Sequence, residues 1–165
     1  MNYMQISHCD TLNGEGLRTV LWVSGCSHNC EHCQNPFSHD CKTGICFDDK
    51  AKEELFKDLN EDWCSGITFS GGDPLYEKNR STIIELAKEI KEKFPKKNIW
   101  LYTGYTWNEI VNDETMIDIL KYVDTVVDGP FVESLRDPSL KWRGSSNQNI
   151  IDVKKRIKQV SSLSN

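Results

Sequence analysis

The sequence has no excess of positive charge. Its 165 residues include 20 Lys and Arg against 25 Asp and Glu, so the net charge is −5 at pH 7 and the isoelectric point is near 5.4. Proteins that bind nucleic acid usually carry a basic excess clustered on one face. We therefore expect no direct contact with nucleic acid.

Long apolar runs are missing as well. No stretch approaches the roughly 20 apolar residues that span a bilayer. The first ten residues, MNYMQISHCD, lack the basic and apolar regions of a secretory signal. We expect a cytoplasmic protein without membrane contact. Its seven cysteines fit this reducing compartment, where clustered thiols bind metal more often than they form disulfides.

Internal repeats, low-complexity tracts and linker-like stretches are also absent from the sequence. A chain of 165 residues with 38% hydrophobic residues fits one domain with a buried core. We expect this domain to span residues 1–153 and a short polar tail to occupy residues 154–165.

The sequence does contain an alternation of strand-like and helix-like segments. The expected strands are 19–24, 67–70, 99–102 and 125–127, and the expected helices are 50–60, 82–94 (opening on a capping box of Thr82 and Glu85) and 107–120. This order predicts an α/β fold with a mostly parallel sheet and right-handed crossovers. A barrel of six βα units needs roughly 200 residues, at about 30 or more per unit. We therefore expect an incomplete, partial β/α barrel.

Four glycine-rich or cysteine-rich segments follow the four expected strands. They are the cysteine loop after residue 24, GGDP at 71–74, TGY at 103–105 and DGPF at 128–131. In folds of this kind the chemistry lies at the carboxyl ends of parallel strands. The four segments are therefore predicted to meet on one rim.

The strongest chemical signal is the run CSHNCEHC, which places Cys26, Cys30 and Cys33 in a C-x3-C-x2-C arrangement. Three thiolates gathered in one loop can bind three irons of a [4Fe–4S] cluster and leave the fourth iron without a protein thiolate. An open metal position is a reaction site, as it is in catalytic zinc enzymes. The pattern favours a catalytic cluster.

Two alternatives remain open from the residues alone. Structural zinc is one, with His28 or His32 as a fourth ligand. A ferredoxin is the other, but a ferredoxin normally supplies a fourth cysteine, and the spacing of the remaining cysteines matches no ferredoxin run. We interpret these as ordinary buried or surface thiols: Cys9, Cys41, Cys46 and Cys64. The histidines His8 and His39 are expected on the surface or in loops.

The cysteine pattern after the first expected strand, with GGDP after the second, resembles the radical S-adenosylmethionine superfamily. The similarity narrows further over five blocks, which resemble the anaerobic ribonucleoside-triphosphate reductase activating proteins. The blocks are NGEGLRTVLWVSGC (13–26), SGGDPL (70–75), IWLYTGYTWNEI (99–110), VDGPF (127–131) and LKWRGSSNQ (140–148).

The resemblance implies two cofactors, a [4Fe–4S] cluster on Cys26, Cys30 and Cys33 and S-adenosyl-L-methionine on its open iron. Residues 71–74 have a physical reason to contact the second cofactor. Their two glycines let backbone approach a ligand, the proline fixes the turn, and a carboxylate can accept hydrogen bonds from an ammonium group. The cofactor-binding residues expected from the resemblance are His32, Cys33, Gln34, Gly71, Gly72, Asp73, Pro74, Thr103 and Asp128.

The implied activity is reductive cleavage of S-adenosylmethionine followed by removal of a hydrogen from a glycine of the reductase. The large catalytic subunit of anaerobic ribonucleoside-triphosphate reductase is the implied partner, with reduced flavodoxin or a similar protein as electron donor and a homodimer as a possible assembly. No side chain is nominated as a catalytic acid or base. Three other activities stay open: an activase of another glycyl-radical enzyme such as pyruvate formate-lyase, a small-molecule radical enzyme, and a non-catalytic zinc-binding module.

Overall fold

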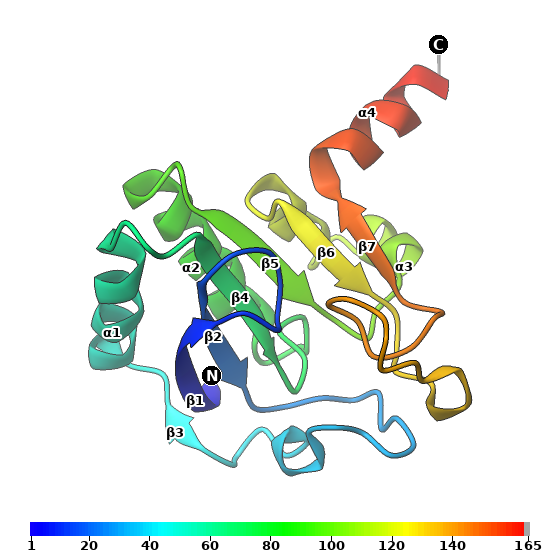
Figure 1. Ribbon diagram of the computed structural model, residues 1–165, viewed down its shortest axis with the longest axis horizontal. Coiled ribbons are helices and arrows are strands. Elements are labelled where there is room, and N and C mark those ends of the chain that lie inside the picture. The colour runs from blue at the N-terminus through cyan, green and yellow to red at the C-terminus, as the bar shows by residue number, and fades with distance from the viewer. Residues whose placement is uncertain (164–165) are drawn as a thin grey trace.

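The computed structural model describes residues 1–163 of the chain, which form a seven-stranded open sheet in the order β3-β1-β2-β4-β5-β6-β7 (Figure 1). The four central strands are parallel: β2 (Arg18–Val23), β4 (Gly66–Gly71), β5 (Asn98–Tyr102) and β6 (Thr125–Asp128). The sheet does not close, so the expected α/β fold and partial barrel are confirmed.

Strands at both edges run antiparallel to their neighbours and were not predicted. These are β1 (Asn2–Asp10), β3 (Ile45–Cys46) and β7 (Asn149–Asp152). None of the three has a fully buried residue. Without a buried face, an edge strand lacks the apolar alternation by which the central strands were recognised.

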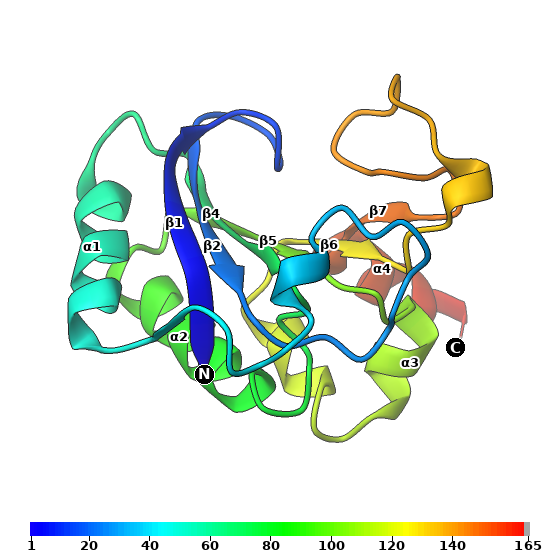
Figure 2. The same ribbon diagram turned by 90° about the horizontal axis from the view of Figure 1, so that it is seen from below.

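The helices lie mainly on one face of the sheet, and loops rise over the other face. Figure 2 shows α1 (Asp49–Asn60), α2 (Arg80–Lys93) and α3 (Trp107–Asn112) on one side, with the β1–β2 and β6–β7 connections opposite. Three short 3-10 helices complete the connections: η1 (Pro36–Ser38), η2 (Ile117–Lys121) and η3 (Glu133–Leu135). Within residues 1–163, no helix is long and apolar enough to span a membrane.

The core fills the space between the helices and the sheet because alternate strand residues point toward the helices. Leu21 and Val23 of β2, Ile67 and Phe69 of β4, and Leu101 of β5 are all fully buried. The residues between them on the same strands face the loop side. That second face carries polar and aromatic residues, and it forms the inner wall of the partial barrel.

Two details of the helices differ from the prediction. The capping box expected at Thr82 and Glu85 is wrong, because α2 begins two residues earlier at Arg80. The capping box that does form joins Thr106 and Glu109 at the start of α3. The helix expected over 107–120 is also broken after Asn112 into α3 and η2.

The carboxyl-terminal segment forms a helix, α4 (Val153–Leu163), which projects away from the sheet (Figure 1). Its side chains from Lys154 to Gln159 are exposed. Val153, its first residue, is buried in the core.

A fully buried arginine closes the amino-terminal end of the parallel strands. Arg18 donates hydrogen bonds to the hydroxyl of Thr68 at 2.8 Å, the carbonyl of Ile67 at 2.9 Å and the side chain of Asn98 at 2.8 Å. The guanidinium also lies 5.4 Å from the ring centre of Trp100. Burial lowers the pKa of Arg18 to about 10, so the group remains charged at neutral pH. It ties β2, β4 and β5 together at the end opposite to the predicted site.

Replacing this arginine should therefore destabilise the sheet itself. We expect Arg18→Leu to lower the free energy of unfolding by about 3 kcal/mol, because several buried acceptors lose their donors. Urea denaturation of the anaerobic, reduced protein measures this. The exposed Arg156→Leu is the matched control and should change stability by less than about 0.5 kcal/mol. A loss below about 1 kcal/mol for Arg18→Leu would contradict the assigned role.

Candidate functional site

A cavity of about 610 Å³ opens at the carboxyl ends of the parallel strands. Its volume lies within the range of about 300–1,000 Å³ typical of ligand sites. Each of the four loops that follow a parallel strand contributes to its lining, so the predicted convergence on one rim is confirmed. The contributing residues from these loops include Cys26, Cys30, Cys33, Gly71, Gly72, Thr103, Gly104, Gly129, Pro130 and Phe131.

The cysteine loop places all three predicted ligands on the cavity wall. Cys26, Cys30 and Cys33 are each partly buried and free of disulfides. Burial raises the pKa of Cys26 to about 11 and also raises that of Cys30. Binding of iron must therefore displace protons from these thiols.

The arrangement is not that of a single-ion site. Within residues 1–163, no three His, Cys, Asp or Glu side chains are grouped as one metal ion would require. A [4Fe–4S] cluster does not require such a group, because each thiolate binds a different iron.

The remaining cysteines lie elsewhere. Among the described residues, the cavity lining contains no cysteine beyond the three of the loop. Cys9 and Cys46 are exposed, Cys64 is buried with its thiol 3.3 Å from the carbonyl of Gly66, and Cys41 lies 3.7 Å from the ammonium of Lys78. This placement fits the interpretation that they are ordinary thiols.

The Asp73 carboxylate joins three of the four loops. It is 1% exposed and accepts hydrogen bonds from the amide of Leu75 at 2.8 Å and the amide of Gly104 at 2.9 Å. The hydroxyl of Thr103 bonds it at 2.9 and 3.0 Å, and Nε2 of His28 lies 2.8 Å away. Its own turn, the end of β5 and the cysteine loop therefore meet on one side chain.

The contact between His28 and Asp73 holds the cysteine loop in place. His28 lies between the first two cysteines, and its ring also packs edge-on against Tyr105, with centroids 4.5 Å apart. The hydrogen bond to Asp73 raises the pKa of His28. A Cβ atom added to Gly104 would come within 2.3 Å of the His28 ring, so only glycine allows this approach.

These contacts give Asp73 a structural role beside the cofactor-binding role expected from the sequence. A carboxylate has about four lone-pair sites, and four protein groups already contact the two oxygens of Asp73, with the single hydroxyl of Thr103 close to both oxygens. The side chain does not line the cavity. Asp73 therefore connects the loops, while hydrogen bonding between its carboxylate and a ligand ammonium group stays a prediction.

The two glycines before Asp73 allow the turn to pack against the cysteine loop. Gly71 has φ of +111°, which favours glycine. A Cβ atom on Gly72 would lie 2.5 Å from the carbonyl oxygen of Gly25 and 2.8 Å from that of Ser38. The backbone of Gly72 therefore approaches the cysteine loop closely and also lines the cavity, and its approach to a cofactor stays a prediction. A side chain at position 72 would therefore disturb the glycine turn and the cysteine loop together.

Of the other residues expected to bind the cofactor, some line the cavity and some lie outside its lining. Gln34 and Thr103 line the cavity. His32 is largely exposed and Pro74 is buried outside the lining. Asp128 is 4% exposed and accepts hydrogen bonds from the amides of Trp107 and Asn149, so it caps α3 and fixes the start of β7.

Several cavity residues lie outside the expected set of cofactor-binding residues. His39 lies in a loop, as one of its two expected placements has it, and this loop lines the cavity. Leu12 and Asn13 reach it from the β1–β2 connection, and Arg143 and Gln148 reach it from the loop before β7. The signal for the second loop was its polar run WRGSSNQ, whereas nothing local marks His39 as a cavity residue.

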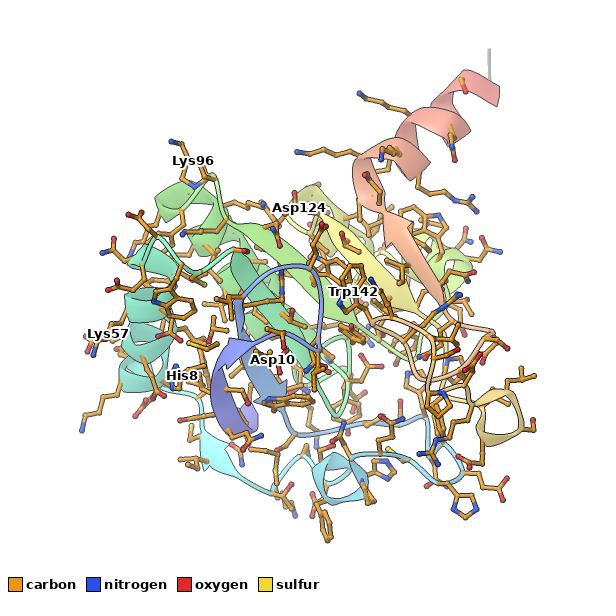
Figure 3. The ribbon with its side chains drawn as sticks, in the orientation of Figure 1. His8, Asp10, Lys57, Lys96, Asp124 and Trp142 are labelled. Atoms are coloured by element: carbon orange, nitrogen blue, oxygen red, sulfur yellow. The ribbon has the colours of Figure 1, made fainter. Side chains whose placement is uncertain are left out.

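Aromatic residues form the inner wall on the sheet side. Trp22 of β2 and Tyr102 of β5 line the cavity. Trp142, from the loop before β7, lines it as well and is labelled in Figure 3. The Tyr102 hydroxyl donates to the carbonyl of Trp142 at 2.8 Å, and the Trp142 ring meets Trp100 edge-on at 5.3 Å. These contacts hold the loop over the open face of the sheet.

A comparison with protein families places this whole region in one domain type. The family described as "4Fe-4S single cluster domain" matches residues 12–151. Every residue of the cavity lining, from Leu12 to Gln148, lies inside that range. The match identifies a 4Fe–4S domain and speaks against the alternative of a zinc module.

Curated relatives cover nearly the full chain. A Pasteurella multocida protein is 41% identical over 152 residues, which are 91% of this chain and 96% of the relative. A protein of Enterobacteria phage T4 is 42% identical over 150 residues, covering 91% and 93%. An Escherichia coli protein is 40% identical over 150 residues, covering 90% and 96%. All three are named anaerobic ribonucleoside-triphosphate reductase-activating protein.

The role of Asp73 can be tested in the absence of any cofactor. We expect Asp73→Asn to lower the free energy of unfolding of the metal-free protein by about 2 kcal/mol, because the amide nitrogen that replaces one carboxylate oxygen cannot accept the hydrogen bonds made to that oxygen. Combining it with His28→Gln should give a loss smaller than the sum of the two. Asp62→Asn, at an exposed position, is the control. Unchanged metal-free stability in Asp73→Asn would show that the carboxylate does not organise the loops.

Proposed function

Because the chain belongs to the family of anaerobic ribonucleoside-triphosphate reductase-activating proteins, we propose that it generates a glycyl radical on the large catalytic subunit of such a reductase. The observation that carries the proposal is the cavity in which three thiols lie beside the glycine turn. When bound there, a [4Fe–4S] cluster and S-adenosyl-L-methionine supply the electron transfer and the radical chemistry. The protein supplies the positions of the reacting groups.

The donor set fits a cluster with one open iron. Cys26, Cys30 and Cys33 provide three thiolates from a single loop, and the other cysteines are outside the cavity lining of the described chain. Three protein ligands leave one iron for the second cofactor. The loop is held in place from two sides, since the amide of Cys26 donates to the carbonyl of His39 at 3.1 Å and His28 bonds Asp73.

The binding site proposed for S-adenosylmethionine is the part of the cavity beside the glycine turn. Gln34, Gly71, Gly72 and Thr103 are the expected cofactor-binding residues that line it. Asn35 supports this arrangement, because its side-chain amide donates to the carbonyl of Gly71 at 3.3 Å. Asp73 acts through Thr103 and the turn, as its contacts indicate.

Protection of a reactive intermediate requires a wall that excludes water and stray hydrogen donors. The aromatic residues Trp22, Tyr102, Phe131 and Trp142 line the cavity. The one phenol among them is already engaged, since the Tyr102 hydroxyl donates to the carbonyl of Trp142. The phenol O–H of Tyr102 is thus directed at a fixed acceptor.

A protein substrate suits the open side of the partial barrel. The sheet ends at β3 on one side and at β7 on the other, and these edges do not meet. A loop of a large partner can enter through such an opening and complete the enclosure, whereas a small molecule would be poorly sequestered. We place the reaction in the cytoplasm, with reduced flavodoxin or a similar protein as electron donor; a homodimer is compatible with it.

The ligand assignment predicts a clear division among the cysteines. Cys26→Ser, Cys30→Ser and Cys33→Ser should each lose most of the iron bound after anaerobic reconstitution and reduce activation at least 100-fold. The corresponding changes at Cys9, Cys41, Cys46 and Cys64 should retain both. Iron analysis and absorption near 400 nm measure loading. Full iron content in Cys26→Ser, or loss of the cluster in a folded Cys46→Ser, would refute the assignment.

The substrate assignment predicts a radical on the partner. With reductant and S-adenosylmethionine alone, cofactor cleavage should be slow; adding the reductase large subunit should yield 5′-deoxyadenosine and a persistent doublet in electron paramagnetic resonance. Deuterating the partner's glycine should collapse the doublet, and changing that glycine to alanine should abolish it. Stoichiometric turnover with a small metabolite, without a partner radical, would favour the small-molecule alternative.

A further inference from the structure

His39 occupies an unusual position beside the cysteine loop. It directly follows η1 and lines the same cavity as Cys26, Cys30 and Cys33. Its carbonyl accepts a hydrogen bond from the amide of Cys26 at 3.1 Å, and the neighbouring Ser38 carbonyl accepts from Gly25 at 2.7 Å. These two bonds hold the His39 backbone alongside the first cluster ligand.

The His39 ring contains a buried polar atom that lacks a partner. Its Nε2 is shielded from solvent and makes no hydrogen bond to any residue in 1–163. Two other histidines of the chain differ, since His28 bonds Asp73 and His8 bonds both Asp58 and Glu54. A buried nitrogen without a partner is costly, so a partner is expected in the loaded protein.

We propose that Nε2 of His39 donates a hydrogen bond to a sulfur atom of the cluster. The inference rests on the three-cysteine ligation proposed above. It is supported by the backbone pairing with Cys26, which places His39 next to a proposed ligand, and by the position of His39 in the cavity lining. Sulfide and thiolate sulfurs are the acceptors that a cluster presents to its surroundings.

Such a hydrogen bond would change how easily the cluster is reduced. Reduction adds negative charge to the cluster, and a hydrogen bond to a sulfur stabilises that charge. His39 would thus make reduction of the cluster easier. It acts as a positioning and tuning residue, since it does not contact the reacting carbon.

The direct test is the reduction potential of the reconstituted protein without S-adenosylmethionine. Removing the donor in His39→Leu should make one-electron reduction about tenfold less favourable, which is a shift of about 59 mV to more negative potential. His39→Gln keeps an N–H group of similar reach and should restore most of the difference. His8→Leu, which removes a histidine outside the cavity lining, is the control and should not move the potential.

A second measurement does not depend on how well His39→Leu folds. In wild-type protein with 15N label confined to the histidine rings, pulsed electron paramagnetic resonance of the reduced cluster should detect a weak ring-nitrogen coupling of His39. This coupling is identified as the component that is missing from the spectrum of His39→Gln and still present in His28→Gln and His32→Gln. An unchanged potential in His39→Leu, or a coupling that persists in His39→Gln, would overturn the inference. Weaker S-adenosylmethionine binding with an unchanged potential would also overturn it, by assigning the donor to that cofactor. Failure of the wild type to bind a cluster would instead refute the proposed function.

Discussion

The site depends on one buried carboxylate. Asp73 accepts hydrogen bonds from its own turn, from the end of β5 and from His28 in the cysteine loop. Hydrogen bonds to a charged group contribute about 1.5–3 kcal/mol each, so these contacts are strong enough to fix loops that are distant in sequence. The positions of the three cysteines relative to the glycine turn follow from this interaction.

The parallel sheet makes such a junction possible. Strands β2, β4 and β5 deliver their loops to one rim, while Arg18 ties the same three strands together at their opposite ends. At the rim, Gly72 and Gly104 remove the side chains that would separate the loops. Gly72 packs against the backbone of Gly25 and Ser38, and Gly104 packs against the ring of His28. The cavity lies next to these packed loops.

The sequence predicted those features whose cause is local. The cysteine spacing, the glycine turn and the alternation of apolar segments each depend on neighbouring residues, and all three reappear in the cavity and the central sheet. The exposed edge strands carried no apolar alternation and were missed. The start of α2 was misplaced because Asn79, its N-cap residue, donates to the carbonyls of Ser24 and Asp73 instead of capping the helix.

The roles of Asp73 and His39 could not be read from the sequence, because their partners are distant or absent from it. His28 and Asp73 are separated by 45 positions, and the backbone of His39 pairs with that of Cys26, 13 positions earlier. The most direct test of this account is an anaerobic crystal structure with the cluster and S-adenosylmethionine bound. We predict that Asp73 still bonds His28, Thr103 and Gly104. An Asp73 carboxylate that has left His28 to bind the ammonium group of the cofactor would contradict the account.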